Sequence, residues 1–137
     1  MYIFSDIWLL LVLDSLKVLD KAPGSFYVTE TALESPCYDH IQRQRMKILI
    51  HDGKLMTFST DEDFLMFYFR ESIKYPGLHR MDFAAIYHCM RTKGFLVERN
   101  SNIRECALDN GVDTLPMEKI LNNIIKDKKY AEYVKRL

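Results

Sequence analysis

Short apolar stretches alternate with longer amphipathic ones along the chain. Single Gly and Pro residues, rather than long linkers, separate them. The short stretches predict strands, and the longer ones, with apolar residues three or four positions apart, predict helices. The predicted strands are Met1–Asp6, Phe26–Thr29, Leu55–Phe58, Phe95–Glu98 and Val112–Leu115. This order predicts an α/β fold, a three-layer sandwich in which helices cover both faces of a mostly parallel sheet of about five strands.

Capping residues and chain breakers set the expected limits of the helices. The segment from Trp8 to about Asp20 is densely apolar and predicts a largely buried helix. Gly94 and Gly111 are expected to end helices in the left-handed conformation, and Tyr75-Pro76-Gly77-Leu78 has the residues of a type II turn. The remaining predicted helices are Glu30–Glu34 with Thr29 as its cap, Ser35-Pro36 to about Asp52-Gly53, Asp61–Ile73, Arg80–Lys93, Ser101–Asn110 and one from Met117 onward.

Composition and charge narrow the class of protein. Of 137 residues, 48% are hydrophobic and 28% are charged, which is typical of a single domain over residues 1–137, here with a basic helical tail at 126–137. Because 19 Lys and Arg balance 19 Asp and Glu, a bulk positive field for coating nucleic acid is excluded. Cys37, Cys89 and Cys106 lack metal-ligand spacing and predict reduced, buried thiols in the cytoplasm. The apolar start is too short for a membrane span.

Acidic residues follow several of the predicted strands. Asp6 ends the first strand, and Glu34 follows the second. Asp82 begins a helix with an apolar inner face, where a carboxylate needs a helix terminus, an Arg or a metal ion as its partner. Because the carboxyl ends of parallel strands meet at one edge of a sheet, these residues and Glu98-Arg99-Asn100 are expected to converge. Helix capping explains Asp6 or Asp82 taken alone, whereas convergence of oxygen ligands favours Mg²⁺ or Mn²⁺.

Three segments in the second half of the chain resemble the PIN-domain family. They are Met81-Asp82-Phe83-Ala84-Ala85-Ile86, Gly94–Ala107 and Asn110-Gly111-Val112. In that family an Asp that opens a helix precedes a strand ending near Thr-x-Asp or Thr-Arg-Asn, then a helix with Leu-Arg and Ala, then Gly-Val. In the first half, Asp6 and Thr31-Ala32-Leu33-Glu34 resemble the segments that carry the family's first two acidic residues.

PIN domains are typically metal-dependent ribonucleases, and many are toxins of bacterial toxin–antitoxin modules. The resemblance therefore implies an endoribonuclease that cleaves RNA phosphodiester bonds with a water molecule activated by Mg²⁺ or Mn²⁺. It places the catalytic group at Asp6, Glu34, Asp82 and Asn100. An antitoxin protein and a second copy of the chain are further partners that it leaves open, and no membrane partner is expected.

Glu98 departs from the family pattern, which has Thr at this position. It shares one side of its predicted strand with Asn100, whose amide supplies less negative charge than an acid. Glu98 is therefore a candidate to replace the missing acid, and the alternative is a carboxylate that reaches solvent or pairs with Arg104. The metal ligands predicted in this way are Asp6, Glu34, Asp82 and Glu98.

Basic residues near the predicted site are candidates for RNA contacts. Arg99 and Arg104 flank the acidic group and are the first choice. Further candidates are Arg43, Arg45 and Lys47 on one helix, and the tail Lys126–Arg136 with Tyr130 and Tyr133. The four histidines have no metal-ligand spacing and are expected in core or surface roles.

A second hypothesis is a PIN-like domain that has lost efficient catalysis and binds RNA or protein. Three positions favour it. Asn100 stands where the family has an acid or Asn, Glu98 where it has Thr, and Trp8 where it often has Asn. A nucleotide-binding domain is disfavoured, since no Gly-rich phosphate loop follows a predicted strand.

Overall fold

The structure, a computed structural model, describes residues 1–17, 19, 25–36, 38–116 and 118–120. Its strands are β1 (Tyr2–Phe4), β2 (Phe26–Thr29), β3 (Met56–Phe58), β4 (Phe95–Val97) and β5 (Thr114–Leu115). Its helices are α1 (Ile7–Ser15), α2 (His40–His51), α3 (Glu62–Lys74), α4 (Arg80–Thr92) and α5 (Ser101–Asp109), with a 3-10 helix, η2, at Glu30–Glu34. Residues 118–120 are helical, and the predicted tail at 126–137 lies outside the described residues.

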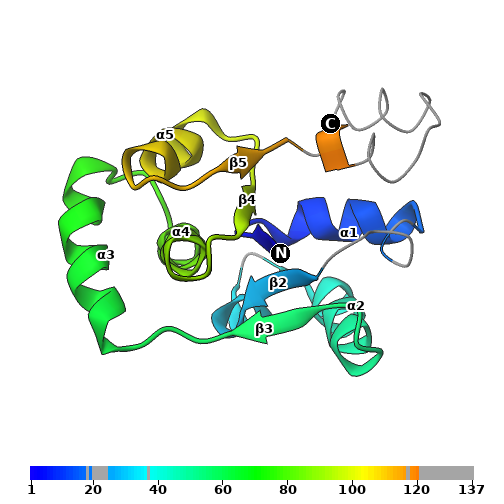
Figure 1. Cartoon of the computed structure of the whole chain (residues 1–137). Coiled ribbons are helices and arrows are strands. Elements are labelled where there is room, and N and C mark those ends of the chain that lie inside the picture. Colours follow the sequence, from blue (N-terminus) through cyan, green and yellow to red (C-terminus); the bar gives the residue numbers. More distant parts are fainter. Residues whose placement is uncertain (18, 20–24, 37, 117, 121–137) are drawn as a thin grey trace.

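The strands form one parallel sheet in the order β3-β2-β1-β4-β5. β1 is central, so that Ile3 lies opposite Tyr27 of β2 and Leu96 of β4. Figure 1 shows α1 and α2 on one side of the sheet and α4 and α5 on the other, with α3 outside α4. The helices between strands supply the crossovers that parallel pairing requires. The predicted α/β three-layer sandwich with a mostly parallel sheet of about five strands is confirmed.

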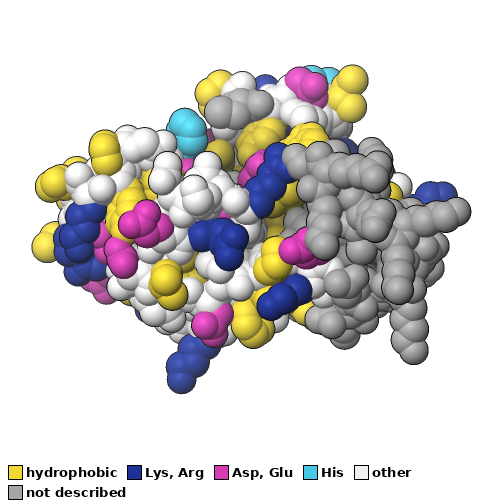
Figure 2. All heavy atoms as spheres, turned by 90° about the horizontal axis from the view of Figure 1, so that it is seen from above, with side chains coloured by type: hydrophobic (Ala, Val, Ile, Leu, Met, Phe, Trp, Pro, Cys, Tyr) yellow, Lys and Arg dark blue, Asp and Glu magenta, His cyan; other side chains and the backbone are white. Residues whose placement is uncertain are grey.

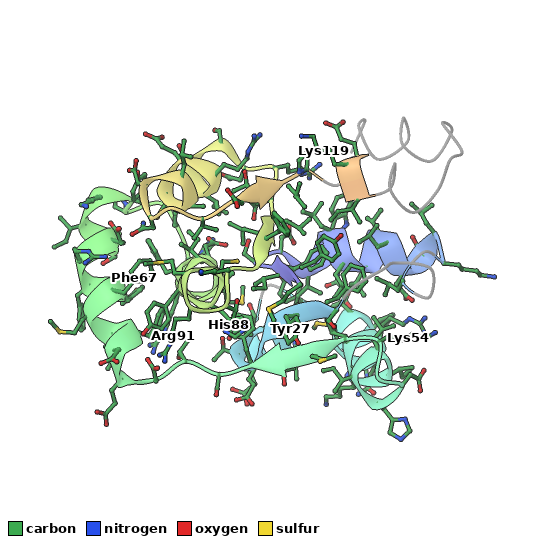
Figure 3. All side chains as sticks on the ribbon, in the orientation of Figure 1. Tyr27, Lys54, Phe67, His88, Arg91 and Lys119 are labelled. Atoms are coloured by element: carbon green, nitrogen blue, oxygen red, sulfur yellow. The ribbon has the colours of Figure 1, made fainter. Side chains whose placement is uncertain are left out.

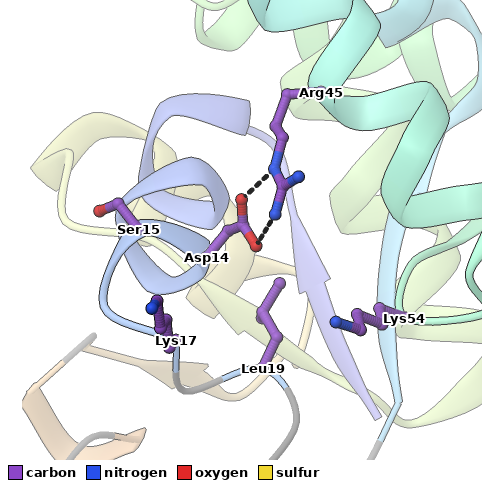
Figure 4. Close-up of a pocket in the computed structure, with 6 residues that line it drawn as sticks. All are labelled: Asp14, Ser15, Lys17, Leu19, Arg45 and Lys54. Carbon is purple, nitrogen blue, oxygen red and sulfur yellow. Dashed lines mark hydrogen bonds and ion pairs between the residues drawn. The ribbon is translucent and has the colours of Figure 1, made fainter.

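An aliphatic core lies between the sheet and the pair α1 and α2. Its fully buried helical side chains include Ile7, Leu10, Leu13, Met46 and Leu49. At the edge of this core, Asp14 of α1 and Arg45 of α2 form a bidentate ion pair (Figure 4). Because the guanidinium is planar, two parallel bonds fix how these helices meet.

The opposite face of the sheet packs against an aromatic core. Phe67 extends from α3 toward α4 (Figure 3), where its ring centroid lies 5.4 Å from that of Tyr87. His88, also on α4, stacks on Phe58 of β3 with ring centroids 4.1 Å apart. Burial, assisted by Arg91, lowers the pKa of His88. His88 is half-buried and packs on an aromatic side chain, which falls within the core or surface roles expected for the histidines.

Two predicted roles of glycine are wrong. The left-handed residue that ends α4 is Lys93, with φ of 57°, and not Gly94. Gly94 matters for a different reason, because a Cβ there would lie 2.8 Å from Cδ1 of the buried Ile3 and would make that side chain shift. Gly77 does not have the positive φ of a type II turn, although Leu78 N–H donates to the carbonyl of Tyr75 as in other β-turns.

Gly111 ends α5 with φ of 72°, as predicted. Several other predicted helix limits shift. Thr29 makes no side-chain capping bond to η2, and α2 begins after Asp39 rather than at Ser35-Pro36. The reason is a capping box: Asp39 Oδ1 accepts from the N–H of Gln42 at 2.8 Å, and Gln42 Oε1 accepts from the N–H of Asp39 at 2.9 Å. The first helix ends at Ser15, five residues before the predicted limit.

The described cysteines are buried and free, as predicted. Burial raises the pKa of the Cys89 and Cys106 thiols to about 12, while Cys37 lies outside the described residues. Within the part of the chain that the structure describes, no helix combines the length and apolar character needed to cross a membrane.

Candidate functional site

A cavity of about 620 Å³ opens where β1 and β4 end and α4 begins. Its polar lining residues are Ser5, Asp6, Tyr38, His79, Asp82, Glu98, Arg99 and Asn100. All of these except Ser5, Tyr38 and His79 are site residues predicted from the sequence. The carboxyl edge of a parallel sheet gathers side chains from separate loops, and here it brings together residues more than 90 positions apart, such as Ser5 and Glu98.

Two buried carboxylates in this cavity share Ser5 as a neighbour. Glu98 is 3% exposed and Asp82 is 7% exposed. The Ser5 hydroxyl donates to Glu98 Oε2, and its proximity to Asp82 also lowers the pKa of that carboxyl slightly against the effect of burial. Because a serine hydroxyl carries one proton, it donates to only one carboxylate at a time. The group Ser5, Asp82 and Glu98, hereafter the carboxylate pair with its serine, therefore has more acceptors than donors.

Backbone N–H groups fix the positions of both carboxylates. Glu98 Oε1 accepts from the N–H groups of Arg99 and Asn100, at 2.9 and 3.0 Å. Asp82 Oδ2 accepts from the N–H of His79, the residue before α4, at 2.8 Å. Within the described residues, no Lys or Arg forms an ion pair with Asp82 or Glu98. The carboxylates are thus held by hydrogen bonds without a Lys or Arg partner there, and the charged group that acts favourably on Asp82 is the side chain of His79 in the cavity lining.

The pKa of Asp82 reflects this environment. Burial raises it above the ordinary value, and the neighbouring Glu98 carboxylate adds to the increase. The hydrogen bond from the His79 N–H acts in the opposite direction but does not cancel the effect of burial. Asp82 therefore binds a proton more readily than an exposed aspartate.

Asp6 and Asn100 line the cavity and also cap helices. Asp6 Oδ1 accepts from the N–H of Trp8 at 2.9 Å at the start of α1. Asn100 Oδ1 accepts from the N–H groups of Asn102 and Ile103, at 2.9 and 3.2 Å, at the start of α5. The capping role that the sequence left open for Asp6 is therefore real, and it coexists with a position in the cavity.

Arg99 supplies positive charge to the lining of the cavity. Its guanidinium lies over the ring of Trp8, 5.1 Å from the ring centroid. Such a cation–π contact is favourable by about 0.5–1 kcal/mol at an exposed site and restricts the side chain. Trp8, which departs from the PIN-domain pattern, thus holds the basic group that the sequence marked as the first choice for binding RNA.

Other predicted site residues lie outside the cavity. Glu34, at the end of η2, is exposed and is not part of the lining, so its role as a ligand stays a prediction. Arg104 is exposed on α5 and does not line the cavity either. Glu98 is buried and bonded to Ser5, so it neither reaches solvent nor pairs with Arg104. Arg45 is already paired with Asp14, and the tail residues Lys126–Arg136 lie outside the described residues.

The donor atoms at the cavity are suited in type to Mg²⁺ or Mn²⁺. They are carboxylate, amide and hydroxyl oxygens, which these hard cations prefer. In the described part of the chain, no three side chains of His, Cys, Asp or Glu are arranged to hold one ion. The fit therefore depends on the two carboxylates Asp82 and Glu98, and Asp6 is the third acid in the lining.

No protein-family model and no curated protein sequence matches this chain. The site is thus defined by the residues of this chain, three of which the sequence did not indicate. Ser5 joins the two carboxylates, and His79 donates its N–H to Asp82. Tyr38 lines the cavity, and its hydroxyl accepts from the N–H of Ile7 at 3.2 Å. A serine, a tyrosine and a backbone group carry no charge pattern that would have distinguished them.

Proposed function

We propose that the chain is a divalent-metal-dependent endoribonuclease whose site is the cavity at the carboxyl edge of the sheet. One observation carries the proposal: Asp82 and Glu98 are buried side by side without an ion pair to Lys or Arg among the described residues. Placing two negative charges in such surroundings costs free energy unless a proton or a cation compensates them. A divalent cation in the open cavity is the compensation that also supports chemistry.

The residues of the cavity have distinct roles in this proposal. Asp82 and Glu98 hold the cation, and Asp6 adds negative charge to the lining of the same cavity. When bound, a divalent cation lowers the pKa of a water molecule and neutralises negative charge on a phosphate. Arg99, held against Trp8, binds a neighbouring phosphate of the RNA. The resemblance of Asp6, Asp82 and Gly94–Ala107 to PIN domains supports the same chemistry.

Cleavage of a labelled single-stranded RNA with Mn²⁺ or Mg²⁺ tests the proposal. We expect cleavage that excess EDTA stops and that Asp82→Asn lowers by about a hundredfold, the loss typical of removing one stabilising group from an active site. The matched control is Glu71→Gln, which alters another buried carboxylate on a different helix, α3, and should leave the rate unchanged. Cleavage that persists in EDTA, or an Asp82→Asn rate equal to the wild-type rate, rejects the proposal.

A second candidate function is a module that binds RNA without cutting it. The observation that favours it is that Asn100 caps α5 and Glu98 uses both carboxylate oxygens in hydrogen bonds within the chain. RNA binding measured by fluorescence anisotropy in the same samples separates the two candidates. Binding that Arg99→Ala weakens, without cleavage in either metal, supports the module.

A further inference from the structure

The outer face of α3 is apolar, although it faces away from the core. Met66, Phe69 and Ile73 are 76%, 63% and 82% exposed, and Leu65 is exposed beside them. Spacings of three, four and seven residues place these side chains on one face of the helix, opposite the buried face that packs against α4. Figure 2 shows hydrophobic side chains, with basic ones beside them, at the end of the molecule where α3 lies.

Single exposed apolar side chains are ordinary, but a contiguous group on one helix is characteristic of a surface that binds another protein. We call Leu65, Met66, Phe69 and Ile73 the α3 face. In the described residues the side chains that line the cavity come from other elements, so the α3 face is separate from the candidate site. A partner bound there would leave the cavity open.

Charges along α3 indicate which partner fits this face. The first turn is acidic, with Glu62 and Asp63. The last part has the exposed bases Arg70 and Lys74, which also lie near the buried Glu71 carboxylate of the same helix. Asp63 and Lys74 are eleven residues apart. This spacing is three helical turns to within about 20°, so both side chains project on the same side of the α3 face. A helix with this charge order is complementary to a copy of itself running in the opposite direction.

We propose that the α3 face binds the α3 face of a second copy of this chain in an antiparallel arrangement about a two-fold axis. Residue 69 is midway between residues 65 and 73, so the axis passes near Phe69 and brings Leu65 against Ile73 of the second copy. The same axis brings Asp63 to Lys74 of the second copy, twice in each dimer. A parallel arrangement would bring like charges together at both ends and is disfavoured.

The size of the α3 face sets the strength of the dimer. One apolar face of a 13-residue helix is smaller than the surface that a standard stable interface buries, about 800 Å² per partner. We therefore expect a reversible dimer whose population rises with protein concentration. Phe69 near the axis contacts its own copy, so it should contribute most to affinity.

Sedimentation velocity over a range of protein concentrations tests the proposal. We expect the wild type to shift from monomer to dimer and Phe69→Lys to remain monomeric. Asp63→Lys and Lys74→Asp should each weaken the dimer about tenfold, because each dimer contains two copies of the altered charge pair. Combining Asp63→Lys with Lys74→Asp restores opposite charges and should recover most of the affinity. Because Lys74 also lies 3.5 Å from the buried Glu71 carboxylate, circular dichroism of each Lys74→Asp protein confirms that it is folded.

Ile41→Lys is the matched control, because Ile41 is 78% exposed on α2, away from the α3 face. It should leave the dimer unchanged. A wild type that remains monomeric at all concentrations overturns the proposal. A dimer that Ile41→Lys disrupts as strongly as Phe69→Lys, or that the double charge exchange fails to restore, also overturns it.

Discussion

Two regions of the molecule each bury a carboxylate, but they compensate its charge differently. Glu71 of α3 is buried, and its oxygens lie 3.5 Å from Lys74 Nζ and 3.8 Å from Arg70 Nη2. Asp82 and Glu98 are also buried, yet their described partners are a hydroxyl and backbone N–H groups. Among the described residues the buried Oε2 of Glu71 accepts no hydrogen bond, so the charge of Glu71 is compensated by its two basic neighbours. The carboxylate pair at the cavity has no such Lys or Arg ion pair among the described residues, and this difference distinguishes a structural acid from a candidate functional one.

The two regions also differ in how the fold positions their carboxylates. Glu71 lies on a helix outside α4, where basic residues three positions along the helix, or adjacent to it, can reach its oxygens. Asp82 and Glu98 come from α4 and from the end of β4, and Ser5 follows β1. Elements distant in sequence bring like charges together only when the packing of the core forces them to meet. The repulsion between the two carboxylates lowers the stability of the fold at this site.

The largest predicted effect comes from removing Glu98. Glu98→Ala leaves the Ser5 hydroxyl and the N–H groups of Arg99 and Asn100 without their acceptor. We expect the free energy of unfolding to fall by roughly 2–4 kcal/mol, since an unsatisfied buried donor costs about 1–3 kcal/mol. Urea unfolding followed by circular dichroism measures this. If the free energy of unfolding falls by less than an ordinary surface substitution causes, these donors do not need Glu98 as their acceptor.

Neutralising Asp82 should have a smaller effect of the opposite sign. Its folded-state pKa is raised above the unfolded value of 3.8. The stabilising contribution is therefore fully present below that value and is lost as pH rises through the folded-state pKa. Asp82→Asn cannot ionise, so it should exceed the wild type in stability by on the order of 1 kcal/mol at pH 7 and show no such loss.

The matched variant sharpens this prediction. Glu71→Gln removes the interaction with Lys74 and Arg70 and should lower stability at pH 7, or leave it unchanged, rather than raise it. The measurement is the free energy of unfolding at pH 4 and pH 7 for the wild type, Asp82→Asn and Glu71→Gln. If Asp82→Asn and Glu71→Gln change stability in the same direction at pH 7, the distinction between the two regions is lost.

Much of the fold could be predicted from the sequence because local signals agree with the packing. The alternation of apolar strands and amphipathic helices is explicit, and Gly111 ends its helix as predicted. The predicted helix limits are wrong where more than one neighbouring residue can begin or end the helix. Lys93 takes the left-handed conformation next to a glycine that matters for its small size, and Asp39 with Gln42 begins α2 later than the Ser-Pro signal indicates.

The candidate site could be predicted in part. Asp6, Asp82, Glu98 and Asn100 were expected at one edge of a parallel sheet, and all four line the cavity. The sequence could not indicate that Ser5 joins two of them, because that contact spans 93 positions and depends on the order of β1 and β4. The exposed position of Glu34 depends on how η2 meets the sheet, which no local pattern specifies.

Calorimetric titration with Mn²⁺ tests most directly whether the carboxylate pair is a cation site. We predict that the wild type binds Mn²⁺, that Asp82→Asn and Glu98→Gln each weaken binding at least about tenfold, and that Glu71→Gln binds as the wild type does. Absence of binding by the wild type, or equal losses in Asp82→Asn and Glu71→Gln, would contradict the central claim that Asp82 and Glu98, which have no Lys or Arg partner among the described residues, make this cavity a cation site.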